Sequence, residues 1–236
     1  MSLTSYHVED RVALLQMDRP NQMNAISTEM LGELLMHLAV AREDENVRAV
    51  VISSTDYSCF SAGADIKEDL DEEGRVTRMQ QFADLYDAVV QCPKPTIAAC
   101  HGYTVGGGAE IAIGCDIRIG GSNLQIRFPG AELGIPVGPA RLVTLCGLSA
   151  AKFLLLTSSV IKADEAFRLN LVNRLAPGAA TENTAMEMAG KIATFDPAAV
   201  ANLKHMLHQW DDVEGRSAEE GRGQVEWQRS GPGLGG

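Results

Sequence analysis

A run of three glycines, Gly106 to Gly108, precedes a single carboxylate, Glu110, at the start of a short apolar segment. Glycine loses much backbone freedom on folding, so three in a row need a reason. One reason is a flexible turn. Another is the close approach of a ligand to the free N–H groups that begin a helix, where negative charge is favoured. Glu110 can cap this helix, or it can act as an acid or base whose pKa burial raises.

The glycine run matches no common phosphate-binding or nucleophile motif. No Gly-Lys-Ser/Thr follows it, the G-x-G-x-x-G spacing fails from Gly102, and the chain holds no G-x-S-x-G. His205 and His208 lie three residues apart on a predicted helix, but no third ligand accompanies them. No metal site is therefore predicted, because zinc sites need at least three protein ligands.

Three further segments extend the pattern around Glu110. Phe60 to Lys67 is a turn rich in small residues, Lys94 to Tyr103 leads into the glycine run, and Leu133 to Pro136 follows downstream. In this order they resemble the enoyl-CoA hydratase/isomerase (crotonase) family, and the resemblance covers roughly residues 6 to 210. Supporting pieces are Arg19-Pro20, Asn24-Ala25, Ala163-Asp164-Glu165-Ala166 and Leu171-Val172-Asn173.

The resemblance implies a fold and an activity. The expected fold is α/β, a crotonase-like spiral of ββα units over residues 1–195 with a helical C-terminal segment over 196–236. The expected substrate is an acyl-CoA thioester, whose carbonyl oxygen the family binds between two backbone N–H groups. By motif position these belong to Ala64 and Gly107, and Glu110 moves a proton or directs a water. Coenzyme A enters only as part of the substrate, and no other cofactor or metal is expected.

The resemblance also assigns residues to substrate binding. Arg19 and Lys67 fall where the family holds the CoA nucleotide, and their positive charge suits phosphate groups. Small residues on both glycine-rich turns let a ligand reach the backbone, and Asp65 is expected to orient the first turn. The residues assigned in this way are Arg19, Asn24, Ala25, Ala62, Asp65, Ile66, Lys67 and Gly106.

One position departs from the family pattern. A typical hydratase carries a second glutamate in P-E-x-x-L-G, and alignment on Leu133 and Gly134 puts Gly130 at that place. Glu132 lies two residues later and reaches the site only if the local register changes, although both residues are expected to border the substrate. Hydration of a 2-enoyl-CoA is the main prediction. A single-glutamate isomerase, a decarboxylase and a non-catalytic acyl-CoA-binding protein remain open alternatives.

Alternating strands and helices must position these residues. Apolar runs predict strands over 11–17, 47–53, 96–100 and 117–119, and a leucine period predicts a helix after Ser27 or Thr28. Further helices are predicted over 150–156, 163–170, 185–195 and 198–210. The acidic segment 68–78 reads as a mobile loop, and the Gly-rich end from Ser230 as disordered. Core positions are expected for Met17, Met23, Met30 and Met36.

Composition narrows the class of protein. The 236 residues are 45% hydrophobic and 22% charged, which is typical of a soluble globular chain. The net charge of −11 argues against a nucleic-acid partner. Five cysteines without a C-x-x-C pair argue against a disulfide framework and favour a reducing, cytoplasmic location. Neither a long apolar run nor a leader pattern is present, so no membrane partner is predicted.

The assembly expected from the resemblance is a homo-oligomer, either a trimer or a dimer of trimers. Members of the family usually continue for one or two helices beyond the segment that resembles Glu226 to Arg229. This sequence has a Gly/Pro-rich stretch there instead. The expectation is that a lid over the acyl-CoA site is missing, or that subunit contacts differ.

Overall fold

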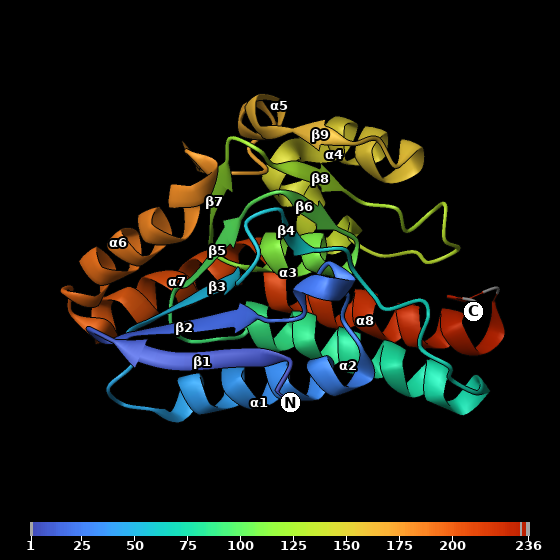
Figure 1. The fold of residues 1–236 in the computed structure, drawn as a ribbon, viewed down its shortest axis with the longest axis horizontal. Coiled ribbons are helices and arrows are strands. Elements are labelled where there is room, and N and C mark those ends of the chain that lie inside the picture. Colours follow the sequence, from blue (N-terminus) through green and yellow to red (C-terminus); the bar gives the residue numbers. More distant parts are fainter. Residues whose placement is uncertain (1, 232, 235–236) are drawn as a thin grey trace.

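The computed structural model describes residues 2–231 and 233–234, which form two sheets surrounded by helices (Figure 1). In spatial order, the larger sheet contains β1 (Thr4–Glu9), β2 (Val12–Met17), β3 (Ala49–Ser54), β5 (Thr96–Cys100), β7 (Ile117–Gly121) and β10 (Arg174–Ala176). The smaller sheet, in the same way, contains β4 (Cys59–Ser61), β6 (Tyr103–Val105), β8 (Gln125–Arg127) and β9 (Ile161–Lys162).

Helices cover both faces of the larger sheet. One core joins the sheet to α1, α2 and α3, and a second, smaller core joins its other face to α6. The helices are α1 (Thr28–Glu43), α2 (Glu72–Val90), α3 (Gly107–Gly114), α4 (Pro139–Thr157), α5 (Ala163–Arg168), α6 (Thr181–Ala193), α7 (Pro197–Asp211) and α8 (Val213–Ser230). Short 3-10 turns occur at η1 (Pro20–Gln22) and η2 (Gly178–Ala180).

The chain advances by a repeated unit of two strands and a helix. β3, β5 and β7 lie in the larger sheet, and each is followed by a strand of the smaller sheet and then by a helix. The neighbouring strands of successive units pair in parallel in both sheets. This arrangement confirms the predicted α/β spiral of ββα units. It also leads the end of β6, Val105, almost directly into the start of α3 at Gly107.

The sequence predicted the start of α1 correctly but missed the start of α2. Ser27 caps α1 as predicted, because its hydroxyl accepts a hydrogen bond from Met30 N at 3.3 Å. The acidic segment was predicted to be a loop, but α2 already begins at Glu72. Asp71 caps this helix by accepting from Gly74 N at 2.8 Å. Acidic residues in the first turn also favour the positive end of the helix dipole, so their charge helps the helix to form.

The predicted disordered end is wrong for the residues that the structure describes. α8 continues to Ser230, and Leu234 beyond it is only 4% exposed. Residues 232, 235 and 236 of the predicted segment lie outside the described residues. α8 runs antiparallel to α2, because Ser217 Oγ donates to Asp87 Oδ1 at 2.7 Å and Gly221 packs against Ala83. The boundary at residue 195 between a spiral core and a C-terminal helical segment remains a prediction.

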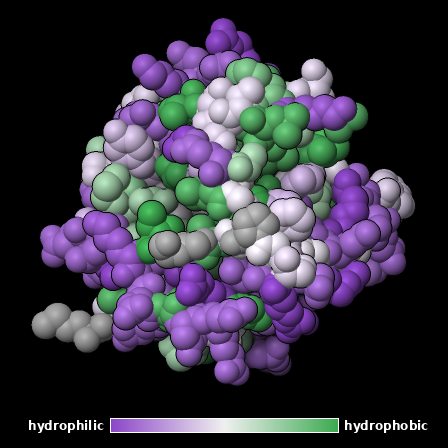
Figure 2. All heavy atoms as spheres, turned by 90° about the vertical axis from the view of Figure 1, so that its right-hand side faces the viewer, coloured by the Kyte–Doolittle hydropathy of each residue, from purple (hydrophilic) through white to green (hydrophobic). Residues whose placement is uncertain are grey.

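An apolar surface runs along α4. Within the described residues, this helix alone is long and apolar enough to pass a length-and-composition test for a membrane span. Gly147 interrupts it with non-helical backbone angles (φ 77°, ψ 160°). Beyond this kink Leu148, Phe153 and Leu156 are exposed. Figure 2 views the side of the molecule to which α4 and the C-terminal end of α8 reach, and apolar atoms gather in its upper half.

Candidate active site

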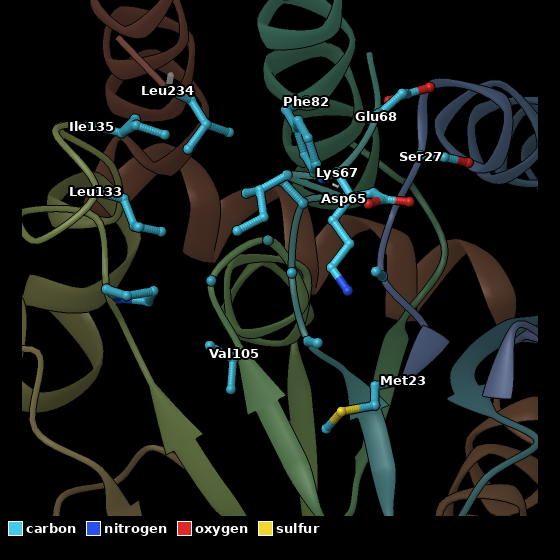
Figure 3. A pocket seen from close by; sticks show the side chains of 18 of the residues that line it. Met23, Ser27, Asp65, Lys67, Glu68, Phe82, Val105, Leu133, Ile135 and Leu234 are labelled. Atoms are coloured by element: carbon cyan, nitrogen blue, oxygen red, sulfur yellow. Dashed lines mark hydrogen bonds between the residues drawn. The ribbon is translucent and has the colours of Figure 1, made fainter. Parts of the chain in front are cut away.

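A cavity of about 890 Å³ opens between α2, the end of α8 and the loops that follow β4 and β8. Figure 3 shows Leu133, Ile135 and Leu234 on one side of it and Asp65 and Lys67 on the other. A concave site with an apolar end and a charged end suits a ligand that has the same asymmetry. The predicted residues that line it are Arg19, Ala25, Ala62, Ala64, Asp65, Ile66, Lys67, Gly106, Gly107, Gly130 and Glu132.

Two backbone turns meet at the wall of this cavity. Gly63 has φ +93°, and a Cβ atom there would lie 2.9 Å from Val105 O and 3.2 Å from Gly107 N. The neighbours of Ala64 bond to Ile26, because Ile26 N donates to Gly63 O at 2.8 Å and Asp65 N donates to Ile26 O at 2.9 Å. These bonds do not use the N–H of Ala64.

A second backbone N–H group without a partner in its own element lies at the start of α3. Gly107 is the first residue of this helix, so its N–H has no partner within the helix. Gly106 precedes it with φ +50° and ψ −120°, a backbone conformation that suits glycine best. The glycine run thus creates a turn in which bare backbone faces the cavity. Ala64 and Gly107 line the same cavity.

Glu110 belongs to a buried charge cluster with Arg141 and Glu220. Arg141 Nη2 donates to Glu110 Oε2 at 2.8 Å and to Glu220 Oε1 at 2.6 Å. The Arg141 guanidinium also lies 4.8 Å from the centre of the Tyr86 ring. Burial raises the pKa of Glu110 to about 7, although the charge of Arg141 opposes this rise. A carboxyl group with this pKa is suited to both giving and taking a proton near neutral pH.

The carboxyl group of Glu110 lies behind the cavity wall. Its residue is 1% exposed and does not line the cavity, whereas Gly107, one turn earlier on the same face of α3, does. A Cβ on Gly138 would lie 2.6 Å from Glu110 Oε1, so the backbone at the start of α4 packs closely against the carboxyl group. Sequence motifs thus located Glu110 near the site, but not its burial.

Comparisons with known proteins agree with this geometry. A family model described as enoyl-CoA hydratase/isomerase matches residues 7–224. The chain is 37% identical over 208 residues to a short-chain-enoyl-CoA hydratase of Clostridium acetobutylicum, covering 85% of this chain and 79% of that protein. This chain belongs to the enoyl-CoA hydratase/isomerase family.

Solved structures of this family share the fold closely. An enoyl-CoA hydratase/isomerase from Xanthobacter autotrophicus Py2 superposes with a TM-score of 0.88 at 27% identity, covering 98% of this chain and 88% of that one. An enoyl-CoA hydratase from Bacillus anthracis superposes with a TM-score of 0.84 at 29% identity over the full length of both chains. A 2,3-dehydroadipyl-CoA hydratase of Escherichia coli (strain K12) is 32% identical, covering 87% of this chain and 81% of that protein.

The charged end of the cavity holds the residues assigned to CoA. Arg19 Nη1 donates to Asp65 Oδ2 at 2.6 Å and to Ala25 O at 2.9 Å, so its guanidinium is tied to the first turn. The Lys67 side chain points into the cavity in Figure 3. Asn24 is fully buried outside the lining, where its Oδ1 accepts from Arg19 N and its Nδ2 donates to Cys59 O, both at 2.8 Å. It supports the turn and does not face the cavity.

The position of the family's second glutamate is bare backbone in this chain. A Cβ on Gly130 would lie 2.6 Å from Ile135 O, so the loop leaves no room for a side chain. Glu132 lines the cavity, but its carboxylate pairs with Arg127 and its side chain is 56% exposed. Neither residue presents a buried second carboxylate beside Glu110.

Several lining residues were not predicted from the sequence. Met23 was expected in the core but is 44% exposed, since it ends the η1 turn with φ +53° and faces the cavity. Phe82 and Tyr86 lie four residues apart on α2 and face the cavity together. Gln224 and Leu234 come from α8 and the residues after it. The i, i+4 aromatic pair was visible in the sequence, but the direction in which it faces was not.

No metal centre accompanies the cavity in the described part of the chain. No group of three or more His, Cys, Asp or Glu side chains there could hold a metal ion. His208 lies 3.6 Å from Asp116 and 3.5 Å from Glu214, while its predicted neighbour His205 is exposed. The five cysteines are free thiols, and four of them are buried.

Proposed function

We propose that this protein is an enoyl-CoA hydratase that adds water across the double bond of a 2-enoyl-CoA. The observation that carries the proposal is the meeting of the Gly63–Ala64 turn with the first N–H of α3 at the cavity wall. The relatives from C. acetobutylicum and E. coli are named as a short-chain-enoyl-CoA hydratase and a 2,3-dehydroadipyl-CoA hydratase, which supports the same reaction class. The proposed reaction uses no metal and no redox cofactor.

To catalyse this reaction, the site must stabilise the negative charge that develops on the thioester oxygen. The water oxygen bonds to C3, the electron pair of the double bond moves toward the thioester, and negative charge develops on the carbonyl oxygen. The N–H groups of Ala64 and Gly107 would donate to that oxygen. Loss of one such preorganised donor typically costs about 2.7–4 kcal/mol of transition-state stabilisation.

Glu110 would move the proton in both halves of the reaction. Its carboxylate accepts a proton from the attacking water and returns it to C2, so the addition balances with one carboxyl group. Because Glu110 lies behind the cavity wall, one water between the carboxyl group and the acyl chain completes the path. Arg141 holds the carboxylate in place at 2.8 Å.

Isomerisation is the second candidate, and the bare backbone at Gly130 favours it. Shifting a double bond from C3 to C2 needs a proton removed from C2 and a proton delivered to C4, which a single carboxyl group can perform. Because a Cβ on Gly130 has no room, no second carboxylate is supplied there. Decarboxylation and simple acyl-CoA binding place still smaller demands on the site.

The ligand in either case would be a CoA thioester with its nucleotide at the charged end. Lys67 and Arg19 lie there, and the apolar residues Leu133, Ile135 and Leu234 lie at the other end. We place the phosphates near Lys67, whose side chain points into the cavity. Arg19 instead fixes the turn through Asp65.

The proposed assembly is a homo-oligomer, a trimer or a dimer of trimers. One group of exposed apolar side chains lies on the second half of α4 and just after it, at Leu148, Phe153, Leu156 and Val160. A contiguous apolar patch on a soluble protein commonly marks a contact surface. We propose that copies of the chain meet through this surface.

Crotonyl-CoA turnover tests the proposed function. Loss of the conjugated enoyl-thioester absorbance is followed for the wild type and for Glu110→Gln, and a 3-enoyl-CoA is assayed for the opposite change. We expect hydration by the wild type and a loss of about 10²- to 10⁴-fold in the variant. Glu219→Gln, an exposed change on α8, serves as the matched control.

Each other outcome points to a different reaction. Turnover of the 3-enoyl-CoA alone would establish isomerisation. Tight binding of butyryl-CoA without turnover of any substrate would establish a binding protein. Full activity of Glu110→Gln on every substrate would refute the role of this carboxyl group.

A further inference from the structure

The acyl end of the cavity carries one polar side chain that the proposed reaction does not use. Gln224 on α8 is 1% exposed and lines the cavity. Its Oε1 is buried and has no hydrogen-bond partner among the described residues. A buried polar atom without a partner costs about 1–3 kcal/mol, so its presence in a ligand cavity calls for an explanation.

The orientation of the Gln224 amide is set by its neighbour. Gln224 Nε2 donates to Glu220 Oε1 at 3.1 Å, and the same carboxylate oxygen accepts from Arg141 at 2.6 Å. A carboxylate paired with arginine can only accept, so the amide must turn its nitrogen toward Glu220. The oxygen of Gln224 is therefore the free atom, and it is an acceptor.

The surroundings of Gln224 place it at the acyl end of the cavity. Val225, the next residue on α8, packs in one cluster with Met79 and Leu234, and Ile135 packs against that cluster. Lys67 and Asp65 lie across the cavity at the charged end (Figure 3). A CoA thioester with its phosphates at the charged end therefore directs its acyl chain toward Gln224.

The hydroxyl of Tyr86 is another polar group in the lining of the cavity. Tyr86 Oη is 3.4 Å from the position that a Cβ on Gly107 would take, and Tyr86 lines the cavity. Burial raises the pKa of Tyr86 well above its usual value, so the phenol is neutral and can both donate and accept. A neutral phenol therefore lies beside the first residue of α3.

We propose that Gln224 selects acyl groups that carry a hydrogen-bond donor, such as a hydroxyl, over apolar or carboxylate-bearing acyl groups of the same length. This inference rests on the proposed function for the direction in which the ligand lies. A hydroxyl at the end of the acyl chain would give Gln224 Oε1 its missing hydrogen bond, whereas an apolar chain would leave that oxygen without a partner. A carboxylate offers only acceptors and approaches Glu220, which is one hydrogen bond away.

Binding of saturated acyl-CoAs tests the selectivity without requiring turnover. Calorimetry compares hexanoyl-CoA, 6-hydroxyhexanoyl-CoA and adipyl-CoA, with shorter hydroxylated and unsubstituted pairs of four and five carbons. We expect the hydroxylated ligand of at least one length to bind about tenfold more tightly than its unsubstituted partner. Adipyl-CoA should bind most weakly of the six-carbon ligands.

A pair of substitutions assigns the preference to the amide. In Gln224→Leu the preference for the hydroxyl should fall below about twofold, because one hydrogen bond is lost. Gln209→Leu, an exposed site on α7, should keep the wild-type preference. If Gln224→Leu does not fold, the affinities of the wild type for hydroxylated and unsubstituted ligands still show whether the preference exists.

Two results would overturn the inference. One is equal affinity for hydroxylated and unsubstituted ligands at every length. The other is a preference that survives in folded Gln224→Leu. The two proposals can fail separately. Hydroxyl selectivity without turnover of any 2-enoyl-CoA would refute the proposed hydratase activity and leave the role of Gln224 standing. Turnover of crotonyl-CoA without hydroxyl selectivity would remove only the role of Gln224.

Discussion

At the scale of single residues, one arginine controls the chemistry of the site. Arg141 is buried between Glu110 and Glu220, with 2%, 1% and 9% of the three side chains exposed. One positive charge therefore faces two carboxyl groups in a setting where charge is costly. Burial and the charge of Glu220 favour protonated Glu110, and Arg141 favours the ionised form. The balance sets the pH at which Glu110 can act as a base.

The first prediction concerns the pH dependence of activity. Glu110 must be ionised to accept a proton from water, so kcat/KM should rise with pH through about 7, the raised pKa of Glu110. In Glu220→Gln a negative charge that raises this pKa is lost, so the acidic limb should move down by about one pH unit. Profiles of kcat/KM from acidic to alkaline pH measure the shift. Glu219→Gln should leave the limb in place, and an upward shift in Glu220→Gln would contradict the argument.

The second prediction concerns stability. Arg141→Met leaves two carboxyl groups buried without a cation, and breaking such a cluster costs about 3–5 kcal/mol of unfolding free energy. The loss should be smaller at pH 6 than at pH 8. Without Arg141 the pKa of Glu110 lies above its wild-type value of about 7, so the folded variant keeps a proton that the folded wild type releases between these two pH values. Urea unfolding at both pH values measures it. Exposed Arg222→Met is the control, and an equal loss in both variants would refute the prediction.

At the scale of secondary-structure elements, close approaches of backbone decide where the strands lead. Gly102 joins β5 to β6 with φ +57°, and a Cβ there would overlap the carbonyl oxygen of Ser58. β6 pairs with β4, and the end of β6 carries the glycine run to the cavity. The turn at Gly102 therefore positions the N-terminus of α3 against the first turn.

The third prediction uses two glycines with opposite surroundings. Gly102→Ala should lower the free energy of unfolding by more than about 2 kcal/mol, because it combines a strained φ with overlap. Gly32→Ala should raise it by roughly 0.5–1 kcal/mol, because Gly32 is exposed within α1 and has nothing within 4 Å of its added Cβ. Chemical denaturation compares both with the wild type. A neutral result for Gly102→Ala would show that the turn can adjust.

At the scale of the whole molecule, the two ends of the chain and its middle combine around one cavity. Leu3, Gly107 and Leu234 all line it, although they lie far apart in the sequence. Outside the cavity, the exposed apolar residues of α4 remain without a partner in a single chain. Self-association through α4 would remove this surface from water, and burial of apolar area stabilises by about 25 cal/mol per Å².

The fourth prediction concerns assembly. The wild type should scatter light as an oligomer of three or six chains of 25.3 kDa each. The double variant Phe153→Asp, Leu156→Asp should shift to the mass of one chain, because charged groups cannot be buried in that contact without cost. Val40→Asp, at a comparably exposed position on α1, should keep the wild-type mass. A wild type of 25.3 kDa would contradict the proposed assembly.

Short-range patterns in the sequence determined much of this protein. The strand at β5, the start of α1 after Ser27 and the glycine run before Glu110 depend on neighbours within a few residues. Their side-chain periodicity and caps are therefore readable in order along the chain. The ordered motifs were specific enough to indicate the family, the spiral fold and the region of the site.

Only the tertiary structure decided the surroundings of the reactive groups. Arg141 is 31 residues from Glu110 and 79 from Glu220, and no periodicity relates positions so far apart. The resemblance implied a helical segment over 196–236, but the residues of α8 gave no separate helix signal, because they are polar and rich in glycine. Gly221 lets α8 approach α2 at Ala83. Burial, charge pairing and cavity shape depend on contacts between distant segments, which exist only once the chain has folded.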